Sequence, residues 1–331
     1  MNPACKRIEV WEGVDEETFR RGIYSARVPA VLRGIPIGPC QSLWDCEYLS
    51  KHGGTQPVKI HVSPDRHMNF LDKNFVYRTL PFDELVKRSA RSVQEEYFLC
   101  EVSVICKHML VINTMPLLDV QTELYYLRSL GADSRKQPAN IQVEFPELAK
   151  DVVLPNFFPE EAFFSSVLRV ASPQLCLWTH YDVMDNFLIQ VRGRKRAILF
   201  HPNDLEYLYM KGDKSQVLDV DNPDLERYPD FLKATRYEAT LDAGDILFIP
   251  ALWFHNMTAL DFGVAVNVFW RHLKSGLYDK NDPYGNKDPL PAGKALALIA
   301  RALKELQELP EDYQQFYSRQ MISQIRQALH T

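Results

Sequence analysis

Apolar residues occur along most of this chain either in alternation with polar residues or in short unbroken runs, and both patterns are typical of β-strands. In the first hundred residues, 29–34 form an apolar run that a glycine ends, and 58–62 alternate. A helix is expected to begin at Phe82, directly after Pro81. Further strand-like runs occupy 166–170, 175–182, 187–191, 196–200, 246–250 and 263–270. Short strands at this spacing predict a mainly β fold with flanking helices, arranged as an antiparallel sandwich or barrel.

Two turns that contain glycine separate some of these strands. The Arg-Gly-Arg sequence at 192–194 lies between the runs 187–191 and 196–200, and it predicts a β-hairpin. The second turn, Ala-Gly-Asp at 243–245, precedes the strand at 246–250. We therefore expect the two strands around 192–194 to pair with each other.

The C-terminal residues have a helical pattern. Residues 279–291 contain three prolines and are expected to form a linker. Two helices separated near Pro310 are predicted after it, and each carries an apolar stripe. The stripes consist of Leu296, Ile299, Leu303 and Leu306 in the first helix and Tyr313, Tyr317, Met321, Ile325 and Leu329 in the second. The pattern leaves open whether they cover the core or pair with a second copy of the chain in a homodimer.

These changes in pattern divide the chain into three parts. Residues 1–122 are expected to form flanking strands and helices with an apolar insertion near 102–122, residues 123–288 the core, and residues 291–331 a helical region that is a candidate for dimerisation. A membrane span needs roughly 18 or more apolar residues with few charges. The most apolar run, 102–120, contains Lys107, His108 and Pro116, so no span and no membrane partner are predicted.

Composition and charge narrow the class of protein. Hydrophobic residues make up 46% of the chain and charged residues 24%, which is enough to fill a core and keep the surface polar. The net charge of -5 provides no general basic field for nucleic acid, although a local basic patch stays possible. The six cysteines form no C-x-x-C pair, and no apolar leader follows the N-terminus. We therefore expect reduced thiols and a cytoplasmic location, with the nucleus not excluded.

A metal-binding pair is predicted where the strand 175–182 ends. His180 and Asp182 are two residues apart, so in a strand they point to the same face while Tyr181 points away. A neutral imidazole and a carboxylate suit Fe(II), and three such ligands on one face leave other coordination positions open. A pair with this spacing is weak evidence by itself, so a third ligand is needed.

His255 is the candidate for that third ligand. The turn at 243–245 and the strand at 246–250 lead into it, which would deliver its side chain to the mouth of a barrel. The other histidines have no spacing typical of ligands. The sequence therefore predicts a metal and catalytic centre made of His180, Asp182 and His255.

Three segments carry a resemblance to a known family. Residues 178–186 (WTHYDVMDN), 250–255 (PALWFH) and 284–289 (YGNKDP) resemble JmjC-domain 2-oxoglutarate oxygenases, and among these the hydroxylases of tRNA wybutosine synthesis. The likeness extends over most of the chain, although the family has a short connector where this chain carries the run 102–122. The resemblance implies a double-stranded β-helix, that is, a cupin-like jelly roll, with the JmjC core at 123–288.

The resemblance also implies cofactors and their ligands. It assigns Fe(II) to His180, Asp182 and His255, contacts with the co-substrate 2-oxoglutarate to Tyr126, Asn186 and Lys195, and O2 as the second co-substrate. The ammonium of Lys195 can meet the distal carboxylate of 2-oxoglutarate in a charge-assisted hydrogen bond. Asn267 is added because related oxygenases often carry an asparagine near the cofactor on the closing strand.

The reaction implied by the resemblance is hydroxylation of a wybutosine precursor, 7-(3-amino-3-carboxypropyl)wyosine, in phenylalanine tRNA. Contact with RNA would need basic residues near the barrel mouth, and the candidates are Arg192, Arg194, Arg196, Lys211 and Lys214. Two other functions remain open. One is a JmjC protein hydroxylase or histone demethylase. The other is a non-catalytic JmjC binding module, against which the intact His180, Asp182, His255 and Lys195 speak.

Overall fold

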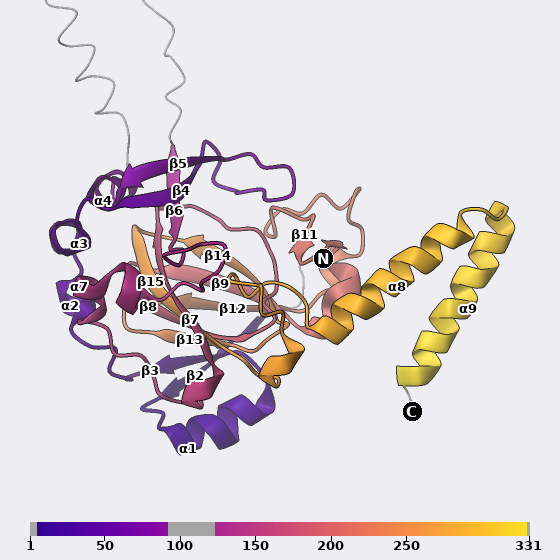
Figure 1. The fold of residues 1–331 in the computed structure, drawn as a ribbon, viewed down its shortest axis with the longest axis horizontal. Coiled ribbons are helices and arrows are strands. Elements are labelled where there is room, and N and C mark those ends of the chain that lie inside the picture. The colour runs from indigo at the N-terminus through magenta and orange to yellow at the C-terminus, as the bar shows by residue number, and fades with distance from the viewer. Residues whose placement is uncertain (1–4, 92–122, 330–331) are drawn as a thin grey trace, which may run out of the picture. The chain divides into compact units, whose positions relative to one another are not determined.

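The computed structural model describes residues 5–91 and 123–329, which form two compact units (Figure 1). The larger unit runs to His272 and includes Pro283–Gly285, and the smaller holds Leu273–Asp282 and the residues from Asn286 onward. The apolar insertion predicted near 102–122 lies outside the described residues. The boundaries predicted at 122 and 288 stay predictions.

Nine strands form the larger of two sheets. In spatial order they are β2 (Glu9–Glu12), β3 (Ala30–Arg33), β13 (Ile246–Ile249), β8 (Asp185–Arg192), β15 (Gly263–Trp270), β7 (Phe163–Ala171), β6 (Leu124–Arg128), β4 (Pro57–Ser63) and β5 (Val76–Pro81). The strands predicted at 29–34, 58–62, 166–170, 246–250 and 263–270 are confirmed as β3, β4, β7, β13 and β15.

Four strands form the second sheet, in the order β1 (Cys5–Arg7), β12 (Arg236–Leu241), β9 (Lys195–Phe200) and β14 (Phe254–Ala259). A small ribbon of β10 (Met210–Lys211) and β11 (Lys214–Ser215) is separate from both sheets. Leu188 and Leu247 of the large sheet share one buried cluster with Leu199 and Met257 of the small sheet. The two sheets therefore pack face to face, and the predicted double-stranded β-helix is confirmed.

The hairpin predicted around 192–194 is wrong. β8 pairs with β13 and β15 in the large sheet, whereas β9 pairs with β12 and β14 in the small sheet. The turn between β8 and β9 therefore carries the chain from one sheet to the other. Gly193 has a φ of +69°, and a Cβ there would lie 2.2 Å from the carbonyl oxygen of Phe262, so the turn requires glycine. The turn predicted at 243–245 is confirmed, and it likewise joins strands of different sheets.

Short helices pack against the outer face of the large sheet. They are α1 (Glu16–Thr18), which continues into a π-helical turn at Phe19–Tyr24, α2 (Cys40–Leu43), α3 (Cys46–Gly53), α4 (Phe82–Ser89), α6 (Ile141–Glu144) and α7 (Pro146–Ala149). Short 3₁₀ helices occur at Glu160–Ala162, Pro202–Tyr207, Phe231–Lys233 and Ser275–Leu277. The helix predicted after Pro81 is confirmed as α4. Its Phe82 and Leu85 share a buried cluster with Phe187 of β8.

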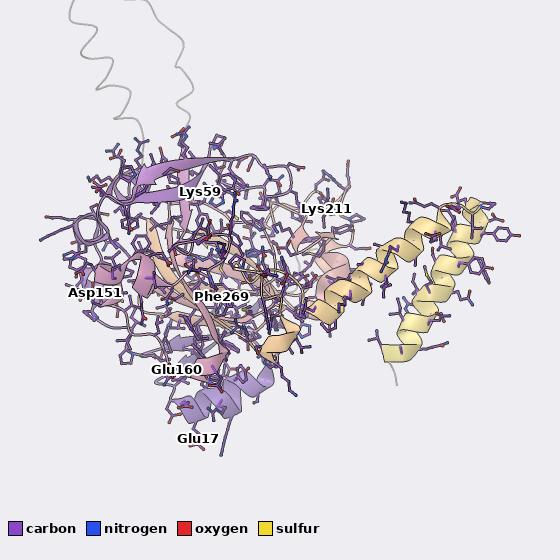
Figure 2. The ribbon with its side chains drawn as sticks, viewed as in Figure 1. Glu17, Lys59, Asp151, Glu160, Lys211 and Phe269 are labelled. Carbon is purple, nitrogen blue, oxygen red and sulfur yellow. The ribbon has the colours of Figure 1, made fainter. Side chains whose placement is uncertain are left out.

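The alternation of side chains along β8 separates this outer core from the interior between the sheets. Phe187 and Ile189 join the cluster under the helices, while Leu188 joins the cluster between the sheets. Phe269 of β15 is buried and Lys211 is exposed; Figure 2 labels the first near the middle of the larger unit in this view and the second near its edge. Polar residues of β8 that share the face of Leu188 therefore point toward the interior.

The two predicted C-terminal helices are confirmed as α8 (Leu290–Leu306) and α9 (Glu311–Leu329), with the break at Pro310. Neither helix contains a buried residue. Their stripe residues Leu296, Tyr313 and Leu329 are 55%, 54% and 78% exposed. The two apolar stripes are therefore accessible to water in a single copy of the chain. None of the described helices has both the length and the apolar character that crossing a membrane requires.

Candidate metal centre

The segment 175–182 lies along β14. It was expected as a regular strand, and this is wrong, because only isolated bridges form within it. The amide of Leu177 donates to Met257 O at 2.9 Å, and the amide of His180 donates to His255 O at 3.2 Å. Two residues therefore face a single residue of β14 between these pairs. This is the arrangement of a β-bulge, which bends a strand and redirects its side chains.

A buried asparagine of β14 stabilises the bulge. The side-chain amide of Asn256 donates to Leu177 O at 2.8 Å and to the hydroxyl of Thr179 at 3.3 Å. Both Asn256 and Thr179 are buried. The bulge therefore has a defined shape at the residue that precedes His180.

His180, Asp182 and His255 are brought together at this point. One potential ligand atom of each lies within 4.8 Å of the others, and Asp182 Oδ2 is 3.5 Å from His255 Nε2. The two imidazole rings have centroids 4.3 Å apart. No second group of three histidine, cysteine or acidic residues with this geometry occurs in the described parts of the chain. Two imidazoles and one carboxylate on one side form a donor set that fits Fe(II).

Hydrogen bonds to carbonyl groups orient both imidazole rings. Nδ1 of His180 lies 3.0 Å from Trp178 O, and Nδ1 of His255 lies 3.1 Å from Trp253 O. Because a carbonyl oxygen only accepts, Nδ1 carries the proton in each neutral ring, and Nε2 keeps its lone pair. Burial lowers the pKa of both histidines, and that of His180 falls to about 3 with a further contribution from His255. Both rings are therefore in the neutral form that binds metal.

The centre adjoins a cavity whose lining includes all four residues predicted to contact 2-oxoglutarate. These are Tyr126 of β6, Asn186 of β8, Lys195 of β9 and Asn267 of β15. The remaining wall is mostly apolar, and its apolar residues are Ala171, Leu175, Leu177, Leu188, Ile249, Met257 and Ala259. Residues from distant parts of the sequence therefore meet at one site, as the prediction requires.

A row of hydrogen bonds crosses the large sheet beside the cavity. Asn267 Nδ2 donates to Asn186 Oδ1 at 2.9 Å, and Arg169 Nε donates to Asn267 Oδ1 at 2.7 Å. The guanidinium of Arg169 also donates to the hydroxyl of Tyr126. Arg169 lines the cavity but was not predicted as a site residue. The sequence nevertheless contained a sign of its role, because Arg169 is the only charged residue of the apolar strand β7.

Lys195 is a buried cation of the small sheet, and unlike the buried Arg236 of β12 it forms no ion pair among the described residues. Its side chain is 7% exposed, and within the described residues its ammonium has no hydrogen-bond or ion-pair partner. Burial, followed by repulsion from Arg169, lowers the pKa of Lys195 to about 7. A buried charge without a partner is unfavourable. An anion bound in the cavity would therefore stabilise this ammonium by giving it a partner.

The basic residues predicted to contact RNA are largely neutralised. Arg194 pairs with Asp261, Arg196 pairs with Asp221, and Lys214 pairs with Asp213. The guanidinium of Arg192 donates to a backbone carbonyl, Trp44 O. These pairs cancel most of the positive charge that the sequence suggested for this surface.

Comparison with known proteins shows the family to which this fold belongs. Residues 16–276 match the family model described as a cupin-like domain. The chain belongs to the cupin-like family. Proteins named tRNA wybutosine-synthesizing protein 5 from Danio rerio and Homo sapiens are each 55% identical to it, over 96% and 95% of this chain and 92% and 94% of their own. The Aspergillus oryzae protein named tRNA wybutosine-synthesizing protein 4 is 35% identical over 90% of this chain but only 26% of its own length.

The cupin-like domain contains the whole candidate centre. His180, Asp182 and His255 fall within residues 16–276, as do the cavity residues Tyr126 and Lys195. The helices α8 and α9 lie beyond the matched range. The similarity to the Danio rerio and Homo sapiens proteins nevertheless extends over nearly the full chain.

Proposed function

We propose that this cupin-like protein is an Fe(II)- and 2-oxoglutarate-dependent dioxygenase. It hydroxylates the side chain of a wybutosine precursor, 7-(3-amino-3-carboxypropyl)wyosine, in phenylalanine tRNA. The observation that carries the proposal is the convergence of two imidazole Nε2 atoms and the Asp182 carboxylate beside a cavity with a buried lysine. The tRNA substrate is supported by the names of the relatives, which refer to wybutosine synthesis.

The ligands proposed for Fe(II) are His180, Asp182 and His255. Their donor atoms come from one side, so the cavity side of the metal would stay open for other ligands. When bound, the iron would use O2 and 2-oxoglutarate to supply the oxidising power that inserts one oxygen atom into a carbon–hydrogen bond. The carbonyls of Trp178 and Trp253 fix the two imidazole rings for this task.

The residues proposed for 2-oxoglutarate lie on both sheets around the cavity. Lys195 would pair with the distal carboxylate, which would give its buried ammonium a partner. Asn186, Asn267 and Tyr126 already form one hydrogen-bonded row through Arg169, which fixes their rotamers. A row held in this way binds a ligand without first having to order its own side chains.

The apolar residues of the cavity have a separate role. Leu177, Leu188, Ile249 and Met257 line the wall around the ligands. They exclude bulk water and leave few reactive polar groups next to an oxidising centre. Such a wall suits a reaction in which the oxidising equivalent must reach the substrate and not the protein.

The proposal is tested by turnover with defined substrates. Purified protein with Fe(II) and 2-oxoglutarate is incubated with phenylalanine tRNA that carries the precursor, or with a peptide pool, and succinate is measured. We expect succinate and a hydroxylated base with this tRNA and not with unmodified tRNA. Turnover with peptides alone would indicate a protein hydroxylase or histone demethylase. No turnover with any substrate would favour a binding module.

We also propose that the chain forms a homodimer through α8 and α9. The stripes of these helices expose large side chains, among them Leu296, Tyr313 and Ile325, and contiguous apolar surface of this kind marks an association site.

The free thiols Cys5, Cys40, Cys46 and Cys176 support the further proposal of a cytoplasmic or nuclear location.

Replacing Tyr317 and Met321 with glutamate is expected to yield monomers, because two charges would be buried in the interface. Light scattering after gel filtration gives the mass. Ser323→Glu, on the opposite side of α9, is the matched control and should leave the mass of the wild-type protein unchanged. A wild-type protein that is already monomeric, or a double variant that keeps the dimer mass, would contradict the proposal.

A further inference from the structure

Two arginines lie directly opposite each other on neighbouring strands. β6 and β7 are antiparallel, and their register pairs Arg128 with Arg169. Side chains of directly opposite residues point to the same face, with Cβ atoms about 4.5–5.5 Å apart, and like charges in this position destabilise a sheet. The pair therefore needs a compensating interaction.

Within the described residues, that compensation does not come from a carboxylate, because neither guanidinium has an acidic group within ion-pair distance. Arg128 donates to Tyr284 O at 3.3 Å and lies over the Tyr284 ring, 5.3 Å from its centroid. Arg169 donates to Asn267 and Tyr126, which are uncharged. Burial, followed by repulsion from Arg169, lowers the pKa of Arg128 to about 10. Among the described residues, the two cations therefore donate hydrogen bonds to neutral groups only.

The arginine pair adjoins the candidate metal centre. Tyr126 precedes Arg128 by two residues on β6, so the two side chains share a face, and both Tyr126 and Arg169 line the cavity. Asp182 acts electrostatically on Arg128. Lys195, proposed to hold 2-oxoglutarate, comes from β9 of the other sheet. With the distal carboxylate of 2-oxoglutarate assigned to Lys195, the arginine pair is the candidate site for a second anion.

The balance of charges around the cavity also favours a second anion. Arg169 and Lys195 line the cavity, Arg128 lies opposite Arg169, and the single negative charge of Asp182 offsets only one of these three cations. A divalent metal and a doubly charged 2-oxoglutarate cancel each other. Two positive charges then remain beside a bound metal and co-substrate, so the substrate that enters is expected to be anionic at the end that reaches the arginines.

We propose that Arg128 and Arg169 form an anion-binding subsite that holds an oxyanion of the substrate nucleotide beside the metal centre. The inference rests on the proposed function. Paired N–H groups of a guanidinium match a carboxylate or a phosphate, and the proposed precursor offers both, in its amino-acid side chain and in the RNA backbone. Holding the side-chain carboxylate would place a neighbouring carbon at the metal and fix the position of hydroxylation.

The test uses Arg128→Met, which keeps an unbranched apolar stem and removes the guanidinium and its charge, and Arg128→Lys, which keeps the charge. Each is assayed on precursor tRNA with the free side-chain carboxylate and on the same tRNA with that carboxylate methylated. We expect Arg128→Met to lower kcat/KM on the free acid by about 10- to 100-fold, the usual effect of losing a hydrogen bond to a charged group. Arg128→Lys should recover part of this loss.

The methylated tRNA distinguishes the two sources of the anion. If the carboxylate is bound, the wild-type protein loses a similar factor on the ester, and Arg128→Met loses nothing further. If a phosphate is bound, esterification has no effect on the wild-type protein, and Arg128→Met is impaired equally on both tRNAs. A variant within twofold of the wild-type value on both tRNAs overturns the subsite, as does a loss confined to the KM for 2-oxoglutarate.

Thermal melting provides a readout that needs no tRNA. Removing one of two opposed like charges should raise the Tm of Arg128→Met by about 1–3 °C. Arg135→Met, at an exposed arginine, is the matched control. A lower Tm would mean that Arg128 stabilises the fold, which overturns the subsite. A wild-type protein that hydroxylates no tRNA overturns the proposed function instead, and the subsite is then judged by melting alone.

Discussion

Asp182→Ala is expected to lose nearly all metal-dependent activity while it keeps its fold. The variant leaves His180 and His255, whose Nε2 atoms stay oriented by the carbonyls of Trp178 and Trp253, but it removes the only anionic donor of the cluster. We expect Fe(II) affinity and succinate formation to fall more than ~100-fold, because even the outer partners of metal ligands contribute about 10- to 100-fold. Anaerobic calorimetry with Fe(II) and the succinate assay measure the two quantities.

The fold should tolerate this change, because the Asp182 carboxylate is partly exposed and the backbone bond from the Leu252 amide to Asp182 O remains. Asp242→Ala, at an exposed aspartate outside the cavity, is the matched control and should bind Fe(II) like the wild-type protein. Metal binding by Asp182→Ala that equals the control would refute the three-residue centre.

Lys195→Met is expected to have opposite effects on co-substrate binding and on stability. We expect the KM for 2-oxoglutarate to rise roughly 30-fold or more, because truncating one partner of a buried charge pair costs about 2–5 kcal/mol. Without co-substrate the Tm should increase, because the ammonium is buried without a partner and an apolar side chain of similar length suits that position better. Initial rates at varied 2-oxoglutarate and thermal melting measure the two effects.

Lys211→Met, at an exposed lysine of β10, controls for the loss of one positive charge and should change neither quantity. An unchanged KM for Lys195→Met would remove Lys195 from the co-substrate site. A lowered Tm with an unchanged KM would give it a purely structural role.

The strands and the cluster of His180, Asp182 and His255 could be predicted because local patterns determine them. The strands β7, β13 and β15 are apolar runs, which is typical of strands buried on both faces. His180 and Asp182 are close in sequence, and the turn before β13 leads directly toward His255. Short-range spacing therefore contained most of the information about this centre.

Pairing partners could not be predicted in the same way. The Gly193 turn has the positive φ of a hairpin turn, yet the following strand pairs in another sheet. The bulge before His180 depends on the buried amide of Asn256, about 80 residues away in sequence. No local sequence pattern predicts the hydrogen bonds of this amide. Such features depend on which strands become neighbours.

The ion-pair partners of charged residues could not be predicted from the sequence either. Arg194 and Arg196 read as free surface charges, but Asp261 and Asp221 lie beside them in the fold. Arg169 was not predicted as a site residue, although it is the only charged residue of the apolar strand β7, and it lines the cavity. A charge in a buried strand therefore merits as much attention as a histidine when sites are sought in a sequence.

The proposed function is tested most directly by mass spectrometry of phenylalanine tRNA from cells that lack this protein. We expect the hydroxylated wybutosine base to disappear and the form that lacks one oxygen atom to accumulate. Re-expression of the wild-type protein should restore the hydroxylated base, whereas Asp182→Ala should not. An unchanged content of the hydroxylated base in cells without the protein would contradict the proposed tRNA substrate.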